Sequence, residues 1–264
     1  MRDLASEAPL RAGGRPWADL RLRVLSALVL LPLGLGCLWL GGWVWVALVA
    51  LGSVGLALEY SAMCGGSAGP VAVLVVAATG CAATGFAGFA LLLLAAGAGT
   101  LWWRGRRIAP VLGVPYVGLT AVALVWLRGQ GTAGFGNVLF VLLVVWATDI
   151  AAYLVGRLIG GPRLAPAISP GKTWSGAVGG LAGALLIGWA ASPGSAAILL
   201  AALLSVVAQA GDLMESGIKR RFGVKDSGTL IPGHGGLLDR LDGVLTAAPA
   251  AALLALAAGR GVGF

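Results

Sequence analysis

The sequence predicts an all-α, polytopic integral membrane protein with about nine transmembrane helices and a cytoplasmic N-terminus. The 264-residue chain has a mean hydropathy of +0.95, and charged residues make up only 11% of it, against roughly one quarter in soluble domains. Apolar stretches of about 17–25 residues recur, and each is long enough to cross the ~30 Å hydrocarbon layer of a bilayer as a helix. A transmembrane β-barrel would instead show segments of about ten residues with alternating hydrophobicity.

The N-terminal part of the chain, residues 24–130, is predicted to hold five spans. A polar, basic tail over residues 1–23 precedes them, and the long apolar run that follows lacks a signal-peptide cleavage site, so the first span stays in the membrane. The Gly41–Gly42 turn separates the first two spans, and the Ala- and Gly-rich stretch 70–103 divides into two more near residues 85–88. The spans cover about 24–41, 43–60, 70–103 as a pair, and 108–127.

The C-terminal part, residues 131–264, is predicted to hold four spans and the residues that carry chemistry. The spans cover about 136–156, 174–192, 195–213 and 237–258, with polar loops at 157–173 and 212–236. Lys and Arg accumulate on the cytoplasmic side of membrane proteins. With nine spans, only Arg128 and Arg260 of the 18 Lys and Arg residues fall on the outer side. Both polar loops are therefore expected to face the cytoplasm.

The charge distribution disfavours two classes of function. The net charge of +8 does not indicate a nucleic-acid partner, because the basic residues lie in short loops between spans, where they set the orientation. A secondary transporter that uses Asp149 and Asp212 as coupling residues is a less favoured alternative. Its charges would be expected to line a path across the membrane, within repeated halves. Here the charges cluster on one side, and no repeat is visible.

A dense group of charges lies around the second polar loop and the start of the last span. Carboxylates flank a basic cluster and a glycine-rich turn, which holds the only histidine. The residues are Asp212, Glu215, Lys219, Arg220, Arg221, Lys225, Asp226, Gly233, His234, Gly235, Gly236, Asp239, Arg240 and Asp242. Carboxylates and phosphate oxygens suit Mg²⁺, Lys and Arg neutralise a triphosphate, and the backbone N–H groups of such a turn can bind an anion.

These residues predict a site that handles phosphates. The alternative is a loop of positive charges that set the topology, followed by aspartates whose charge matches the dipole at a helix start. That alternative explains the signs of the charges, but it explains neither the glycines nor the carboxylates on both flanks. His234 could act as a general base or could only shape the turn, and an ionised phosphate nucleophile needs no base.

Two segments upstream add candidate residues. Asp149 lies late in the sixth predicted span, where an acidic side chain is costly and usually faces a polar cavity or a partner. A structural ion pair with Arg157 or Arg163, or a position already at the membrane interface, is equally open. The segment SPGKTWSG, residues 169–176, precedes a helix and contributes Ser169, Lys172 and Thr173. Thr173 is placed as the N-cap, beside free backbone N–H groups that could receive an anion, although a plain helix cap explains the same pattern.

The segment SGIKRRFGVKDSGTLIPGHGGLLDRLD, residues 216–242, resembles the signature of the phosphatidate cytidylyltransferase (CDP-diacylglycerol synthase) family. TDIAAYLVGRLIG (148–160) and ISPGKTWSG (168–176) resemble other blocks of that family, so the resemblance covers roughly 145–245. Ser175 stands where the family commonly carries glutamate. The resemblance implies an integral membrane enzyme that transfers the cytidylyl group of CTP to phosphatidate, giving CDP-diacylglycerol and pyrophosphate.

The resemblance also implies cofactors, partners and a location. It implies Mg²⁺, with a second cation such as K⁺, and a homodimer surrounded by membrane lipids. The expected location is the bacterial cytoplasmic membrane, with the active site facing the cytoplasm. Family members build the metal centre from the positions of Asp212 and Asp239, and Asp149, Asp242 and Asp226 are further ligand candidates.

The resulting hypothesis assigns a role to each group. An oxygen of phosphatidate attacks the α-phosphorus of CTP, in line with the departing pyrophosphate. The catalytic candidates are Asp212, Lys219, Arg220 and Asp239. The substrate-binding candidates are Ser169, Lys172, Thr173, Ser216, Lys225, His234, Gly235, Gly236 and Arg240. A CTP-dependent transferase or kinase that acts on another membrane lipid is the alternative within the same chemistry.

Overall fold

The computed structural model describes residues 16–105, 107–192 and 194–258, and within these ranges it is a bundle of nine α-helices with one short β-hairpin. Residues 1–15 of the predicted tail and Arg260 lie outside the described residues. The first five helices are α1 (Pro16–Leu40), α2 (Gly42–Cys64), α3 (Ala68–Ala83), α4 (Ala87–Trp103) and α5 (Ile108–Arg128). The remaining elements are the 3-10 turn Gly131–Ala133, α6 (Gly134–Ile159), β1 (Arg163–Ala165), β2 (Ser169–Thr173), α7 (Trp174–Ala191), α8 (Ser195–Arg221) and α9 (Leu238–Ala257).

The helices confirm the predicted class of all-α polytopic membrane protein. Seven of the described helices are long and apolar enough to cross a membrane. The other two, α3 and α4, are apolar but have only 16 and 17 residues. They are separated near Gly85, whose backbone φ is +90°, so the predicted division of 70–103 is confirmed. The number of spans and the cytoplasmic N-terminus remain predictions.

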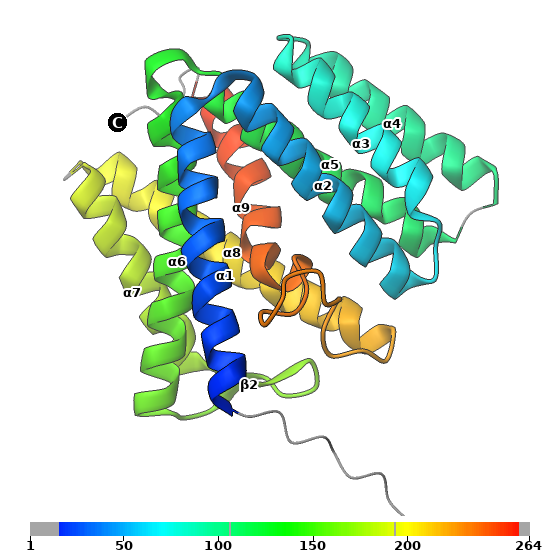
Figure 1. Ribbon diagram of the computed structural model, residues 1–264. Coiled ribbons are helices and arrows are strands. Elements are labelled where there is room, and N and C mark those ends of the chain that lie inside the picture. Colours follow the sequence, from blue (N-terminus) through cyan, green and yellow to red (C-terminus); the bar gives the residue numbers. More distant parts are fainter. Residues whose placement is uncertain (1–15, 106, 193, 259–264) are drawn as a thin grey trace, which may run out of the picture.

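The helices form two groups (Figure 1). In the first group α3 packs against α2, α4 and α5, and in the second α6, α7, α8 and α9 pack against one another. The contact between α5 and α9 is the most extensive one between the groups. Helix α1 is loosely attached, since only 6% of its apolar part, Leu22–Leu40, is buried.

Helix α8 runs further than hydropathy indicates. It continues to Arg221, so the first part of the predicted loop 212–236 is helical, and only residues 222–237 form the loop between α8 and α9. Two local effects favour the extra turns. Three basic residues in the last turn suit the negative end of the helix dipole, and Lys219 pairs with Glu215 one turn earlier at 3.1 Å.

The predicted loop 157–173 is largely structured as well. Helix α6 continues to Ile159, and the following residues form an antiparallel hairpin in which Arg163 of β1 lies opposite Thr173 of β2. This hairpin and loop 222–237 lie at the same end of the molecule. The Arg220 guanidinium at the end of α8 donates to the carbonyl oxygen of Ile168 at 3.3 Å and to that of Val224 at 3.2 Å.

Candidate active site

A cavity of about 550 Å³ lies between α6, α7, α8, α9 and the hairpin. This volume is within the range of pockets that bind small molecules. Side chains far apart in the sequence meet here. The charged residues of its lining are Asp149, Arg157, Lys172, Asp212, Asp239, Arg240 and Asp242.

Three carboxylates from three helices approach one another in this cavity. Asp149 of α6, Asp212 of α8 and Asp242 of α9 lie close enough for their negative charges to interact. One Asp212 oxygen pairs with the Lys172 ammonium of the hairpin, and the other accepts a 3.5 Å hydrogen bond from the Ser216 hydroxyl. Asp242 accepts the N–H of Gly243 at 2.7 Å.

The donor chemistry of this acidic group fits Mg²⁺. Within the residues that the structure describes, no three Asp, Glu, His or Cys side chains form a closed metal-binding cluster. Mg²⁺ does not need such a cage, because it commonly binds one or two carboxylates and completes its shell with water and substrate phosphates. The aspartates of α6, α8 and α9 can supply the protein's share of those ligands.

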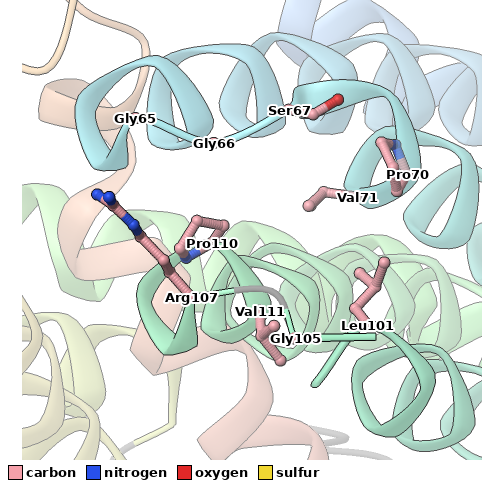
Figure 2. Close-up of a pocket in the computed structure, with 10 residues that line it drawn as sticks. All are labelled: Gly65, Gly66, Ser67, Pro70, Val71, Leu101, Gly105, Arg107, Pro110 and Val111. Atoms are coloured by element: carbon pink, nitrogen blue, oxygen red, sulfur yellow. The ribbon is translucent and has the colours of Figure 1, made fainter. Parts of the chain in front are cut away.

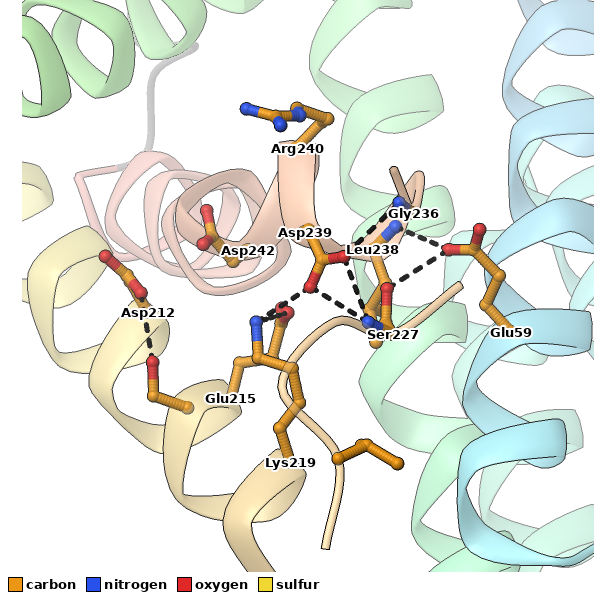
Figure 3. A network of polar contacts seen from close by, with 12 residues as sticks. Glu59, Asp212, Glu215, Lys219, Ser227, Gly236, Leu238, Asp239, Arg240 and Asp242 are labelled. Atoms are coloured by element: carbon orange, nitrogen blue, oxygen red, sulfur yellow. Dashed lines mark hydrogen bonds and ion pairs between the residues drawn. The ribbon is translucent and has the colours of Figure 1, made fainter. Parts of the chain in front are cut away.

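Asp239, in the first turn of α9, faces the cavity and also holds the loop between α8 and α9 (Figure 3). Its Oδ1 accepts the Lys219 ammonium at 2.8 Å. The backbone N–H of Ser227 lies 3.2 Å from Oδ1 and 3.0 Å from Oδ2, and that of Gly236 lies 3.3 Å from Oδ2. Asp239 is therefore bound by more protein donors than the other three cavity aspartates.

Lys219 is oriented by a second carboxylate behind the cavity. Its ammonium lies 3.1 Å from Oε1 of Glu215, a residue whose side chain is only 1% exposed. The Tyr116 hydroxyl of α5 donates to the other Glu215 oxygen at 3.5 Å. Lys219 is not part of the cavity lining, but it binds the carboxylate of Asp239, which is.

Backbone N–H groups of the glycine turn donate hydrogen bonds to oxygens of the protein itself. Gly233 and Gly235 have φ values of +76° and +88°, in the left-handed region that glycine adopts readily. The Gly235 N–H donates to the Ile231 carbonyl at 3.1 Å, and the Gly236 N–H donates to Asp239. Contrary to the predicted anion-binding role, these two N–H groups are engaged by the chain's own oxygens.

His234 does not line the cavity. Its Nδ1 lies 2.7 Å from the Ser26 hydroxyl of α1. Its carbonyl oxygen accepts two hydrogen bonds from the Arg240 guanidinium, at 3.0 and 2.6 Å. Of the two roles left open by the sequence, this geometry favours shaping the turn and attaching α1.

The SPGKTWSG segment begins α7 as expected. Thr173 is the N-cap, and its Oγ1 accepts the Gly176 N–H at 3.1 Å. Lys172 lines the cavity, and its ammonium forms an ion pair with the Asp212 carboxylate. Ser169 is half-buried in β2 and does not line the cavity.

Other predicted residues lie outside the cavity lining. Ser216 supports Asp212, Arg220 binds backbone carbonyls, and Lys225 and Asp226 are exposed on the loop. Asp149 lines the cavity, and within the described ranges no ion pair joins it to Arg157 or Arg163.

Several residues of the site were missed by sequence reasoning. Tyr153 and Arg157 line the cavity from α6, on the same helix face as Asp149, and the Arg157 guanidinium donates to the Tyr153 hydroxyl at 3.2 Å. The i, i+4, i+8 spacing from Asp149 could have identified both. Glu59 of α2 was also missed, although an acidic residue in an apolar span is the signal that identified Asp149.

A second cavity, of about 240 Å³, lies between the α2–α3 connection and the start of α5 (Figure 2). Arg107 is the charged residue of its lining, beside the backbone of Gly65 and Gly66. Its lining includes none of the carboxylates described above, so it offers no metal ligands of that kind.

Comparisons with known proteins identify the family of this chain. The model of the cytidylyltransferase family matches residues 21–257. The chain is 42% identical over 254 residues to the phosphatidate cytidylyltransferase of Brucella suis biovar 1, covering 88% of this chain and 91% of the relative. It is 38% identical over 288 residues to that of Pseudomonas aeruginosa, covering 92% and 99%. Over 152 residues it is 41% identical to that of Staphylococcus saprophyticus, covering 53% and 55%. The chain therefore belongs to the cytidylyltransferase family, as the resemblance of residues 216–242 indicated.

Proposed function

We propose that this protein is a phosphatidate cytidylyltransferase, which converts CTP and phosphatidate into CDP-diacylglycerol and pyrophosphate. The observation that carries the proposal is the meeting of aspartates from α6, α8 and α9 with Lys172, Arg157 and Arg240 in one cavity of a membrane helix bundle. The names of the relatives support the choice of CTP and phosphatidate as substrates.

The reaction joins two groups that repel each other. A phosphatidate oxygen forms a bond to the α-phosphorus of CTP, and the bond from that phosphorus to the bridging oxygen of the β-phosphate breaks. Pyrophosphate leaves with the bonding electron pair. The attacking oxygen is already ionised, so the step needs electrostatic stabilisation and alignment more than a general base.

The acidic part of the cavity would hold the metal ion. Asp212 and Asp239 are the principal ligand candidates, and Asp149 and Asp242 complete the group. A bound Mg²⁺, with a second cation such as K⁺, would neutralise phosphate charge and polarise phosphoryl oxygens. Asp239 would enter this role already fixed by Lys219 and by the loop N–H groups.

The basic residues at the cavity would bind the phosphates. Lys172 lies on the hairpin, Arg157 at the end of α6 and Arg240 in the first turn of α9. Lys172 is paired with Asp212, and it could exchange that carboxylate for a phosphate oxygen of a substrate. Arg157 contacts a neutral hydroxyl, which leaves its charge available to an anionic headgroup.

The membrane setting completes the proposal. The cavity lies at the end where the hairpin and loop 222–237 meet, and the distribution of Lys and Arg predicts that this end faces the cytoplasm. CTP is available on that side, and only the phosphatidate headgroup needs to reach the polar cavity while its acyl chains stay between helices. We place the protein in the bacterial inner membrane, and the homodimer is expected on the family resemblance.

One assay tests the function. The purified protein in detergent is incubated with CTP, phosphatidate and Mg²⁺, and CDP-diacylglycerol and pyrophosphate are measured. Equal amounts of both products are expected, with none after chelation by EDTA and recovery on adding Mg²⁺. Diacylglycerol in place of phosphatidate tests the lipid kinase alternative, which predicts CDP and phosphatidate. No product from phosphatidate with any cation would exclude the proposed function.

A further inference from the structure

We infer that Glu59 is a positioning residue, which fixes loop 222–237 against α2 and thereby holds Asp239 in its place at the cavity. Glu59 does not line the cavity and belongs to the N-terminal group of helices. The inference rests on the proposed function for its catalytic consequence, whereas the contact itself is independent of that function.

The Glu59 carboxylate is buried, and its hydrogen-bond donors among the described residues belong to loop 222–237 and to the first residue of α9. Its side chain is 6% exposed. Oε2 accepts the Leu238 N–H at 2.8 Å and the Ser227 hydroxyl at 3.4 Å, and Oε1 accepts the Leu230 N–H at 3.3 Å. A buried carboxylate is costly without compensating hydrogen bonds, and within the described residues no ion pair involves Glu59. The three donors of the loop region therefore stabilise it.

Two of these donors belong to residues beside Asp239 in the network (Figure 3). Ser227 donates its hydroxyl to Glu59 and its backbone N–H to Asp239. Leu238 directly precedes Asp239 in the chain, and its N–H makes the shortest of the hydrogen bonds to Glu59. Glu59 thus holds both the backbone that leads into Asp239 and the loop residue that binds its carboxylate.

Two glycines let the loop fit closely between the carboxylates. A Cβ added to Gly228 would lie 2.6 Å from Oε1 of Glu59. A Cβ added to Gly236 would lie 2.8 Å from Oδ2 of Asp239 and 2.9 Å from the Gly228 nitrogen. These distances are too short for any side chain larger than hydrogen. Glycine at both positions therefore lets the loop backbone pack closely against the Glu59 and Asp239 carboxylates.

The decisive variant is Glu59→Gln. A glutamine keeps one acceptor oxygen and places an NH₂ group where the second oxygen accepted an N–H, so at least one loop donor loses its partner. Displacement of catalytic groups by about 1 Å can cost about a hundredfold in rate. We expect kcat at saturating CTP and phosphatidate to fall at least about tenfold, while the KM for phosphatidate stays within about twofold of the wild type.

A second measurement tests how firmly loop 222–237 is held, and it does not depend on enzymatic activity. Trypsin cleavage after the exposed Lys225 in loop 222–237, followed by mass spectrometry, is expected to be several-fold faster in Glu59→Gln. Far-UV circular dichroism and size-exclusion elution should match the wild type. Ser53→Ala is the matched control, because Ser53 is a buried polar residue of α2 whose hydroxyl donates within the helix to the Val49 carbonyl at 2.7 Å. It should change neither kcat nor the cleavage rate.

The outcomes separate the inference from the proposed function. A kcat of Glu59→Gln within twofold of the wild type, an unchanged cleavage rate after Lys225, or a loss of activity that only follows a loss of folded protein would each overturn the positioning role. If the wild type makes no CDP-diacylglycerol, the proposed function fails. The cleavage comparison then still decides whether Glu59 holds the loop.

Discussion

The Lys219 ammonium of α8 lies 2.8 Å from Oδ1 of Asp239 in α9, and this contact joins the two helices directly behind the cavity. The same ammonium meets the buried Glu215, so one cation compensates two carboxylates. Asp239 is consequently fixed before any ligand binds. Such preorganisation is what electrostatic catalysis requires, because the charges then need little rearrangement during the reaction.

Replacing Lys219 should destabilise the protein as well as inactivate it. Lys219→Met leaves Glu215 and Asp239 without their shared cation, and removing one partner of a buried ion pair typically costs about 3–5 kcal/mol. We expect a clearly lower unfolding temperature in detergent together with loss of CDP-diacylglycerol formation. Arg104→Met, which removes an exposed cation at the end of α4, is the control. A stable, fully active Lys219→Met variant would contradict the bridging role.

Asp212→Asn should separate activity from stability. The Asp212 and Lys172 side chains are 28% and 27% exposed, and such accessible pairs contribute about 0–1 kcal/mol to folding. Removing the carboxylate should therefore leave thermal unfolding nearly unchanged. We expect turnover to fall by at least about a hundredfold, as when a preorganised electrostatic group is lost. Turnover near that of the wild type would exclude Asp212 as a ligand of the proposed metal ion.

Lys172→Ala should have a milder effect than Asp212→Asn. Arg157 and Arg240 remain at the cavity, so only one charge-assisted contact to a phosphate is lost. Such a contact is typically worth about 1.5–3 kcal/mol, which corresponds to at least about a tenfold loss in kcat/KM. An unchanged rate would mean that the SPGKTWSG segment serves only to begin α7.

Arg157→Met should weaken substrate binding more than turnover. Arg157 lies at the cavity but is not among the residues that fix Asp239, so we expect the KM for phosphatidate or CTP to rise about tenfold with kcat largely retained. Varying each substrate in turn identifies which phosphate it binds. Arg163→Met, an exposed arginine of β1 outside the cavity lining, is the matched control. Equal effects of both variants would point to a general loss of positive charge.

His234→Ala should leave the chemistry intact. The imidazole contacts Ser26, and the attacking phosphate needs no base, so we expect kcat within about threefold of the wild type and the same pH–rate profile. Loss of the hydrogen bond to α1 should lower stability by about 1 kcal/mol. Ser26→Ala should have the same effect, and the double variant should be no worse than either one. A changed pH–rate profile in His234→Ala alone would restore the general-base alternative.

The approximate positions of the helices along the chain could be predicted from the sequence because lipid imposes length and hydrophobicity on each span. The end of α8 shows the limit of that signal. Hydropathy falls near residue 213, yet the helix continues to Arg221. Hydropathy reports contact with lipid, whereas the polar last turns of α8, of which only Asp212 lines the cavity, are stabilised by the Glu215–Lys219 pair.

Their role in a metal site stays a prediction, but the acidic residues that line the cavity, Asp149, Asp212, Asp239 and Asp242, were predictable as candidates. The supporting contacts were not. Whether a glycine N–H faces a ligand or a neighbouring carboxylate depends on the path of the loop, which composition does not determine. Glu59 is separated from its hydrogen-bond partners by more than 160 residues, so local pattern could not pair them.

The hydrogen bonds of Glu59 also limit which segments can be exchanged between homologous chains. They cross the division near residue 130 that separates the N-terminal helices from the region with the cavity. A chimera of two homologues joined at that point would combine the carboxylate of one parent with the loop of the other. Its two halves would be compatible only if the second parent's loop offered donors at the positions of Ser227, Leu230 and Leu238. Helix α2 and loop 222–237 are thus matched parts, and a functional exchange would have to carry α2 together with residues 222–238.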